Sequence, residues 1–447
     1  MLKNIKYNAT PQGFDIIIEA LNKQFERVCV FNSNINTNHN KYLQSSMIIA
    51  VDFSREIIIA NSENALEKLQ GFINQGNDWF FGYLSYDIKN EIEKLASENF
   101  DGLCFPLLHF FVPKVVLKFD GDSIDVIYDD EFISEEEALA VFMIATASNK
   151  SNIYFNELEQ TNYLNSRDGI GDKVFIQSKI SKQEYINSVN ILKQHILKGD
   201  IYEINFCQEF FAENTIIAPV KIFEKLNLIS QAPFSAYCKL GKNYVLCASP
   251  ERFLQKNGDN LIAQPIKGTI KRSSIKIEDD LLKMELKNSE KERSENVMIV
   301  DLVRNDLARL AQPGTVTVDE LFGVYSFNQL HHMISTINCK LKTDTSFTDI
   351  IKCTFPMGSM TGAPKVSAMK LIESIESSKR GLFSGTIGYI SPEGDFDFNV
   401  VIRSILYNSE NKYLSFMVGS AITDKSVPEK EYEECLLKAN AMIKALA

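Results

Sequence analysis

Short runs of hydrophobic residues alternate with polar turns through the first third of the chain. Apolar runs at 28–31, 47–53 and 57–60 are separated by turns rich in Asn and Ser, and an aromatic run follows at 79–86. Runs of this length, bounded by turn residues, are typical of strands. Residues 1–145 therefore predict a mixed α+β region with antiparallel strands.

The pattern then changes twice. Residues 146–180 are rich in Asn, Ser, Asp and Gly and show little periodicity, which predicts a surface connection. At Ser181 a helical pattern begins: Ser181 and Glu184 form a capping box, apolar residues follow at helical spacing, and Gly199 marks the end. We therefore expect a second region over residues 181–447 that opens with this helix.

Two later stretches predict antiparallel strands joined by tight turns. Strand-like runs flank Asn257-Gly258-Asp259, and the segment 383–422 repeats the scheme with turns at 392–395 and 408–411. Further helices are expected at 290–308, 363–376 and 429–446. Strands grouped in meanders, with helices between the groups, favour an α+β fold over a doubly wound parallel sheet.

Composition and charge narrow the class of protein. The 447 residues include 45% apolar and 23% charged residues, as in folded globular chains. With 47 basic and 58 acidic residues the net charge is -11, so no overall positive field would attract nucleic acid or an anionic membrane. The first residues lack the apolar stretch of a signal peptide, and no apolar run approaches the ~18 residues of a membrane span. We expect a cytoplasmic protein that binds neither nucleic acid nor membrane.

The first candidate for chemistry is an acid and an amine. Glu251 and Lys267 lie almost symmetrically about the turn at 257–259, which predicts near cross-strand neighbours. Such a pair can be a surface ion pair worth under about 1 kcal/mol. Lys267, however, lies between Pro265 and Gly268, which restrict the backbone on both sides, and a partly desolvated lysine can be neutral enough to attack carbon.

Carboxylates recur at helical spacing in two of the predicted helices. Glu292 and Glu295 share one helical face, and Glu431, Glu434 and Lys438 share another. A solvated acidic face is the ordinary interpretation. If the two faces meet, their carboxylates could bind Mg²⁺ and leave coordination positions for an anionic ligand.

Three weaker signals remain. The small-residue loop 358–365 runs into a helix and is either a site for a carboxylate or phosphate or a plain helix cap. Strand alternation places Arg403 on the same face as Asp397, so Arg403 either clamps a carboxylate or forms a structural salt bridge. His331 and His332 are adjacent, so at most one of them can face a given site.

Six sequence motifs together resemble the chorismate-utilising enzymes. The motifs are GDIYEINFCQ (199–208), SPERFL (249–254), PIKGT (265–269), ENVMIVDLVRNDLAR (295–309), GSMTGAPK (358–365) and FSGTIGYIS (383–391). The resemblance is nearly continuous from 181 to 446, with only looser features such as FFGYLSYD (80–87) before it. It implies large antiparallel sheets in a sandwich flanked by helices. The chain is most similar to the aminodeoxychorismate synthase component I group, which has lysine at the position of Lys267 where anthranilate synthases have alanine.

The resemblance also implies a reaction. Lys267 would attack C2 of chorismate while Glu251 protonates the departing C4 hydroxyl, and ammonia would then add at C4 and expel the lysine. The product would be 4-amino-4-deoxychorismate, a precursor of p-aminobenzoate and folate. The alternatives are an anthranilate synthase component I of tryptophan biosynthesis and a non-catalytic chorismate-binding subunit.

Site residues carry over from the family position by position. Glu295 and Glu434 match its Mg²⁺ ligands, with Glu292 and Glu431 at the nearby carboxylates. The substrate-binding positions are Thr269, His332, Ser359, Arg403, Gly419 and Lys438, so His332 is preferred over His331.

Two features of the sequence concern the choice between ammonia and water as the nucleophile and the source of the ammonia. At the position of Glu203 the ammonia-using members commonly have glutamine, and the water-using members have lysine. A glutamate at this position argues against the water-using branch. The role of Glu203 stays open, and one hypothesis is that it accepts a hydrogen bond from a neighbouring group. The chain has no Gly-x-Cys-x-Gly glutaminase motif. Family precedent therefore predicts a separate glutamine amidotransferase subunit that supplies ammonia.

Overall fold

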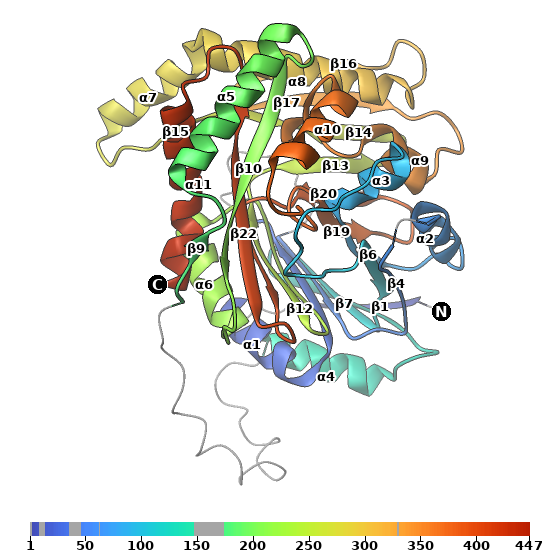
Figure 1. Cartoon of the computed structure of the whole chain (residues 1–447). Helices are drawn as coiled ribbons and strands as arrows, with labels where there is room; N and C mark the ends of the chain where they lie inside the picture. Colours follow the sequence, from blue (N-terminus) through green and yellow to red (C-terminus); the bar gives the residue numbers. More distant parts are fainter. Residues whose placement is uncertain (1, 9–13, 35–45, 62, 147–173, 329) are drawn as a thin grey trace.

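The computed structural model describes residues 2–8, 14–34, 46–61, 63–146, 174–328 and 330–447. Most of the predicted connection, residues 147–173, lies outside these ranges. Within them, antiparallel strand pairs build two large sheets, one of twelve strands and one of ten (Figure 1). The predicted α+β class is confirmed.

The twelve-stranded sheet takes strands from both ends of the chain. In sheet order its main path is β1-β8-β7-β3-β2-β11-β12-β21-β22-β10-β18, and β9 pairs with β10. Its strands are β1 (Leu2–Asn8), β2 (Arg27–Asn32), β3 (Met47–Val51), β7 (Val115–Asp120), β8 (Ser123–Asp129), β9 (Gln177–Ser178), β10 (Glu203–Ala212), β11 (Phe234–Leu240), β12 (Asn243–Ser249), β18 (Gly362–Ala363), β21 (Ser404–Asn408) and β22 (Tyr413–Ile422).

The ten-stranded sheet also takes strands from both the N-terminal and the C-terminal parts of the chain. Its path is β15-β17-β14-β13-β20-β19-β5-β6-β4, and β16 pairs with β17. Its strands are β4 (Arg55–Ile59), β5 (Phe80–Leu84), β6 (Leu108–Val112), β13 (Arg252–Asn257), β14 (Asn260–Gln264), β15 (Ile266–Lys271), β16 (Thr317–Ser326), β17 (Leu330–Lys340), β19 (Thr386–Ile390) and β20 (Phe396–Val400). Each sheet therefore joins the predicted regions 1–145 and 181–447, whose division along the chain stays a prediction.

Helices pack against both sheets. The α-helices are α1 (Phe14–Gln24), α2 (Ala65–Ile73), α3 (Lys89–Ile92), α4 (Glu135–Thr146), α5 (Lys182–Lys198), α6 (Pro219–Ser230), α7 (Lys276–Asn288), α8 (Glu290–Ala308), α9 (Phe347–Thr354), α10 (Lys365–Ile375) and α11 (Pro428–Leu446). Two short 3₁₀ turns are η1 (Tyr86–Ile88) and η2 (Gly358–Met360).

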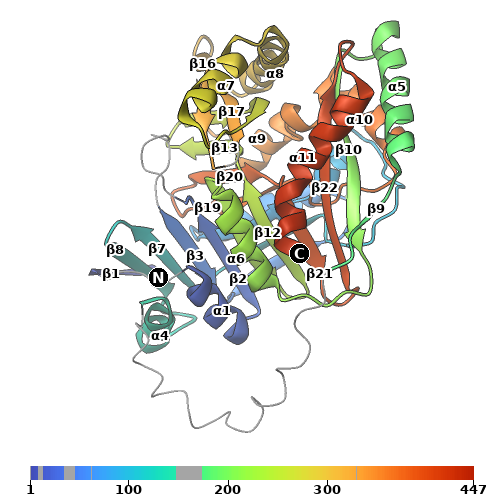
Figure 2. The same ribbon diagram turned by 90° about the vertical axis from the view of Figure 1, so that its left-hand side faces the viewer.

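Two hydrophobic cores hold these layers together. One joins the facing sides of the two sheets and continues onto α2, α8 and α9, and the other joins the opposite face of the twelve-stranded sheet to α1, α4, α5, α6 and α11. On β2, Val28 and Val30 face the helices and Cys29 faces the other sheet. Figure 2 shows α6 and α11 lying over the twelve-stranded sheet. The predicted sandwich flanked by helices is confirmed.

Local signals explain the elements that were predicted well. The capping box of Ser181 and Glu184 is present at the start of α5, and Gly199 ends the helix with φ 83°. Asn257 pairs with Asn260 across the predicted turn, where Gly258 has φ 55°. The predicted helix 363–376 begins later, at Lys365, because Gly362 and Ala363 pair with β10 as strand β18.

The segment 383–422 is not one meander. Its first hairpin, β19–β20, belongs to the ten-stranded sheet, and its second, β21–β22, belongs to the twelve-stranded sheet. Among the places where the chain crosses between the sheets are residues 401–403, between β20 and β21, and residues 250–251, between β12 and β13. Both crossings prove important for the site.

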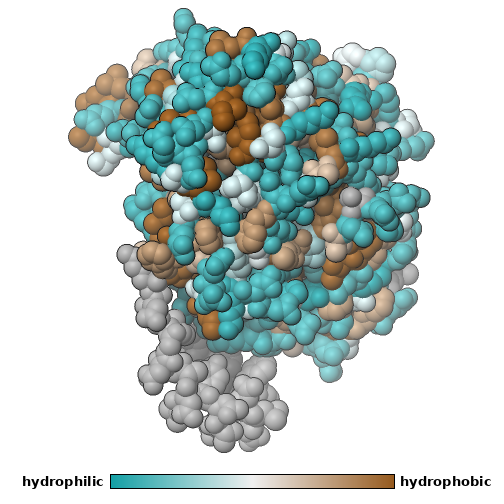
Figure 3. All heavy atoms as spheres, viewed as in Figure 1, coloured by the Kyte–Doolittle hydropathy of each residue, from teal (hydrophilic) through white to brown (hydrophobic). Residues whose placement is uncertain are grey.

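Most of the face seen in Figure 3 is hydrophilic. An apolar stripe on α7, formed by Ile277, Leu281 and Met284, is more than half exposed. Among the described residues, no helix is both long and apolar enough to cross a membrane.

Candidate active site

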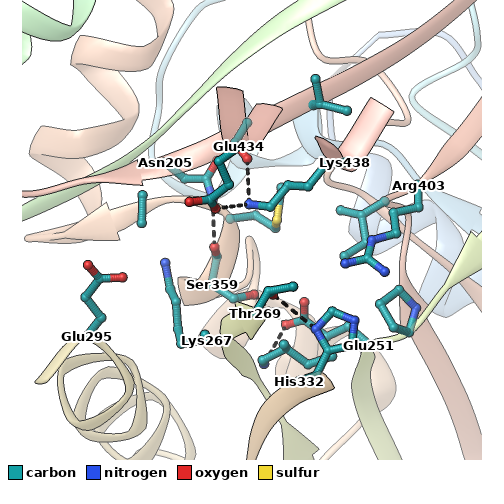
Figure 4. A pocket seen from close by; sticks show the side chains of 18 of the residues that line it. Asn205, Glu251, Lys267, Thr269, Glu295, His332, Ser359, Arg403, Glu434 and Lys438 are labelled. Carbon is teal, nitrogen blue, oxygen red and sulfur yellow. Dashed lines mark hydrogen bonds and ion pairs between the residues drawn. The ribbon is translucent and has the colours of Figure 1, made fainter. Parts of the chain in front are cut away.

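A cavity between the sheets gathers most of the predicted site residues. Its walls come from β10 and β22 of one sheet, β15 and β17 of the other, the two crossings, η2, α8 and α11. The predicted residues that line it are Glu251, Lys267, Thr269, Glu292, Glu295, His332, Ser359, Arg403, Gly419, Glu434 and Lys438 (Figure 4). Glu431 is not among the lining residues.

A β-bulge aims Lys267 into the cavity. Ile266 pairs with Ile334 and Thr269 with His332, so β15 carries one extra residue between these pairs. Gly268 allows the bulge because its φ is 94°, and a Cβ at this position would lie 3.0 Å from a carboxylate oxygen of Glu292. The lysine between proline and glycine is thus directed by the backbone.

The ion-pair partner of Lys267 is Glu203 and not Glu251. Lys267 Nζ donates a hydrogen bond to Glu203 Oε1, and both side chains are buried. Lys267 belongs to β15, which pairs with β17, so the prediction of cross-strand neighbours on one hairpin is wrong. The alternative of a surface ion pair is wrong as well, because Glu251 and Lys267 are buried.

The carboxylates around Lys267 keep it charged. Burial lowers the pKa of the ammonium, but Glu203, Glu295 and Glu251 outweigh burial and raise the pKa above its ordinary value. The expectation of a partly neutral lysine is therefore not met by this structure. The proton must leave before Nζ can act as a nucleophile.

Glu251 is placed to be a proton donor. It lies at the crossing between β12 and β13, where Ser359 Oγ donates a hydrogen bond of 2.6 Å to its Oε1 and the Ile266 amide approaches at 3.5 Å. Desolvation raises the pKa of Glu251 to about 7, against the opposing effects of these hydrogen bonds, Lys267 and Arg403. A carboxyl group that is half protonated near neutral pH suits general acid catalysis.

Arg403 reaches the cavity by a different route from the one predicted. It lies at the crossing between β20 and β21 with φ 50°, so strand alternation does not apply. Its carbonyl accepts a hydrogen bond from the Ala248 amide, beside the other crossing. The proposed salt bridge with Asp397 is also wrong, because Asp397 pairs with Arg252 at 2.8 Å.

The two adjacent histidines face opposite ways. His332 lines the cavity, its Nδ1 is 3.1 Å from Thr269 Oγ1, and its Nε2 is buried without a hydrogen-bond partner among the described residues. Burial, with Arg403 and Lys438 nearby, holds the pKa of His332 well below its ordinary value. His331 instead contacts Asp279 at 3.0 Å, outside the cavity.

The rest of the wall comes from β22, α11 and η2. The backbone of Gly419 lies so close to β10 that a Cβ at this position would be 2.4 Å from Cys207 Sγ. Lys438 Nζ bonds the Gly419 carbonyl oxygen at 2.9 Å and Glu434 at 2.8 Å. Of the loop 358–365 only Ser359 and Met360 line the cavity, so the start of α10 is not an anion site there.

The four predicted metal ligands come from α8 and α11. Glu292, Glu295 and Glu434 line the cavity, and Lys291 lies 3.8 Å from Glu295 and 3.6 Å from Glu431. Glu295 Oε1 and Glu431 Oε2 are buried without hydrogen-bond partners among the described residues. Desolvation raises the pKa of Glu295 to about 7.

These carboxylates provide the oxygen donors that a hard cation prefers, but their side chains are not gathered around one point. Within the described ranges, no group of three or more His, Cys, Asp or Glu side chains is close enough to hold a metal ion. The oxygen-only donor set and the orphaned carboxylate oxygens on two facing helices nevertheless fit Mg²⁺. Lys291 supplies positive charge between the two helices.

Sequence reasoning missed Asn205 and Lys291. Asn205 lies in the motif 199–208, lines the cavity, and donates a hydrogen bond of 3.1 Å to the carbonyl oxygen of Ser359. Lys291 directly precedes Glu292, so its sequence position was a usable signal. The partner of Glu203 could not be read from the sequence, because β10 and β15 belong to different sheets.

Comparison with known proteins gives a consistent result. The model of the chorismate binding enzyme family matches residues 16–444. Aminodeoxychorismate synthase component 1 of Bacillus subtilis (strain 168) is 32% identical over 374 residues, which are 82% of this chain and 76% of that protein. The chloroplastic aminodeoxychorismate synthase of Arabidopsis thaliana is 36% identical over 382 residues, 82% of this chain and 40% of that protein.

A solved structure agrees with the fold. The crystal structure of anthranilate synthase component I from Streptococcus pneumoniae TIGR4 has a TM-score of 0.75 and 25% identity, and the match covers 92% of this chain and 95% of that one. The chain spans about two fifths of the length of the plant relatives it matches. The resemblance seen in the sequence motifs is confirmed.

Proposed function

This chain belongs to the chorismate binding enzyme family, and we propose that it is an aminodeoxychorismate synthase component I, which converts chorismate and ammonia to 4-amino-4-deoxychorismate. The observation that supports this choice is a lysine amine, Lys267, buried in the cavity beside a protonatable Glu251. An amine at this position can form a covalent intermediate.

The residues of the cavity divide the reaction into two displacements. In the first, Lys267 Nζ forms a bond to C2 of chorismate, the ring double bonds shift, and the C4 oxygen leaves as water with a proton from Glu251. In the second, ammonia bonds to C4, the double bonds shift back, and the bond from C2 to Nζ breaks. Arg403 and Lys438 offer positive charge to the two carboxylates of the substrate.

Magnesium would be held by Glu295 and Glu434, with Glu292 and Glu431 nearby. When bound, the ion supplies positive charge for the ring carboxylate of chorismate. The chain's own contribution is to keep these acidic side chains on two facing helices, with Lys291 between them.

Ammonia would come from a second subunit. The relatives from Bacillus subtilis and Escherichia coli are named as component 1, which implies a further component. We propose that this partner is a glutamine amidotransferase.

Product analysis of two lysine variants tests the proposal. Wild-type protein with chorismate, Mg²⁺ and ammonium should form 4-amino-4-deoxychorismate, identified by chromatography and mass. Lys267→Ala should lose at least ~100-fold in rate because no covalent route remains. Lys267→Arg keeps the charge beside Glu203 without an amine nucleophile and should be equally inactive. Full activity in either variant would disprove the covalent route.

Anthranilate synthase component I is the second candidate. The close match to the Streptococcus pneumoniae structure supports it. In that case the product would be fluorescent anthranilate, and Lys267 would be dispensable. A non-catalytic subunit would bind chorismate and give no Mg²⁺-dependent product.

Intact mass separates these functions most directly. Wild-type protein mixed with chorismate and Mg²⁺, without ammonia, should gain the mass of chorismate less water. Peptide mapping should place the adduct on Lys267. An unmodified Lys267 after this incubation without ammonia would contradict the proposal.

A further inference from the structure

Glu203 has no role in the reaction described so far, yet it is the residue in closest contact with the nucleophile. It is the first residue of β10 and is only 1% exposed. Its Oε1 accepts the hydrogen bond from Lys267 Nζ, and its Oε2 is buried without a partner among the described residues. β18 pairs with β10 at this residue and fixes its backbone.

The geometry leaves few destinations for the lysine proton. An ammonium has no lone pair, so Nζ must lose one proton before it can bond to carbon. Lys267 is 7% exposed, so bulk water has little access to it. Glu251 accepts a hydrogen bond from Ser359 and must give its own proton to the departing oxygen. Glu203, by contrast, already accepts a hydrogen bond from Nζ.

We propose that Glu203 is a catalytic base that takes the proton from the Lys267 ammonium as Nζ attacks chorismate. This inference rests on the proposed function. The carboxylate of Glu203 becomes a carboxylic acid, Nζ becomes a neutral amine and forms the bond to C2, and Glu251 gives its proton to the departing oxygen. When ammonia later releases the amine, Glu203 returns the proton to Nζ and the resting ion pair is restored.

The proposal predicts how the rate of adduct formation changes with pH. The groups facing Lys267 are Glu203 on β10, Glu292 and Glu295 on α8, Glu251 at the crossing and Glu434 on α11. The pKa of Glu251 is about 7, so below this pH the resting enzyme holds a proton on Glu251 and an ammonium on Lys267. If Glu203 accepts the lysine proton, the reacting form holds the same total number of protons as the resting form. The rate of adduct formation should therefore be flat below pH 7 and fall about tenfold per pH unit above it.

Replacing the base should reverse this dependence. In Glu203→Gln the lysine proton must go to solvent before attack, so the reacting form has one proton fewer than the form that predominates below pH 7. The rate should then rise up to about pH 7 and level off. At pH 6 it should lie ~100-fold below wild type, the usual scale for loss of a general base.

The experiment measures adduct formation without ammonia. Rapid-quench mass spectrometry at low chorismate and saturating Mg²⁺ gives the rate from pH 6 to 9 for wild type and Glu203→Gln. Glu209→Gln is the matched control, because Glu209 is a buried carboxylate on the same strand whose contacts are with Tyr413, Ser415 and Ser378. A falling profile in Glu203→Gln like that of wild type would overturn the proposal.

A second measurement does not depend on turnover. Competitive acetylation followed by peptide mapping compares the reactivity of Lys267 with that of Lys438 in the same sample. Without the Glu203 carboxylate, Lys267 should react several-fold faster at pH 8, and the Glu209 variant should match wild type. Unchanged reactivity in Glu203→Gln would refute the pairing. Faster labelling with no chorismate adduct in wild type would instead show that the proposed function fails while the pairing stands.

Discussion

Replacing Ser359 with alanine should move the ionisation of Glu251 to higher pH. Ser359 Oγ donates a hydrogen bond of 2.6 Å to Glu251 Oε1. A donor stabilises the carboxylate form, so this bond opposes the burial that raises the pKa of Glu251 to about 7. Without the hydroxyl, the protonated acid becomes more favourable.

The size of the effect follows from burial. Glu251 and Ser359 are 3% and 4% exposed, so solvent screening weakens their interaction little. A hydrogen bond to a charged group contributes about 1.5–3 kcal/mol. At 1.36 kcal/mol per pH unit, the midpoint of the Glu251 limb should move upward by about one to two pH units.

The assay is the pH dependence of kcat/KM, which reports ionisations of the free enzyme. Wild type should show a limb near pH 7, and Ser359→Ala should show it at about pH 8 to 9. Ser249→Ala is the matched control: Ser249 is equally buried and hydrogen bonds Glu251, but only through the backbone N and O of that residue. A midpoint that stays at pH 7 in Ser359→Ala, or moves as far in Ser249→Ala, would refute the reasoning.

Three further predictions concern stability and the metal. Asp397→Asn should lower the free energy of unfolding by about 3 kcal/mol in urea titration, because Arg252, whose side chain is 0% exposed, loses the negative charge of Asp397 at 2.8 Å. Glu410→Gln, in an exposed ion pair, should change it by less than about 1 kcal/mol. Gly419→Ala should cost about 1–3 kcal/mol in the same titration, because its Cβ would lie 2.6 Å from a backbone oxygen of β10. Lys291→Met should lower the Mg²⁺ concentration needed for half-maximal activity, because an ammonium no longer competes for the two carboxylates beside it.

Elements with local signals were predictable from the sequence. The helix α5 has a capping box and a terminal glycine, and the β13–β14 turn has Asn257 and Gly258 at its centre. Such signals act within a few residues, so the sequence pattern carries them directly. The crossings between sheets at residues 250–251 and 401–403 have no such signal. Strands on either side of a crossing look alike in the sequence, which is why the segment 383–422 was predicted as one meander.

In the candidate site, too, features that depend on local sequence were predictable and contacts between distant elements were not. Residue identities were found because motifs preserve them, and eleven of the twelve predicted residues line one cavity. Their partners were not found, because each depends on a contact between distant elements. Arg403 is at the cavity through a left-handed backbone at a crossing, and Lys267 meets a residue 64 positions away in the other sheet.

The base, the amine and the acid of the cavity come from three different parts of the fold. Glu203 belongs to the twelve-stranded sheet, Lys267 to the ten-stranded sheet, and Glu251 to the chain that passes between them. Packing of the two sheets therefore sets the distance from the amine to its proton acceptor, while the crossing at 250–251 sets the position of the proton donor. Because these are separate structural features, a change in one side chain of β10 can alter how the lysine loses its proton without moving the donor. A glutamate at this position would then tie the enzyme's activity to neutral and mildly acidic pH, where Glu251 still holds its proton.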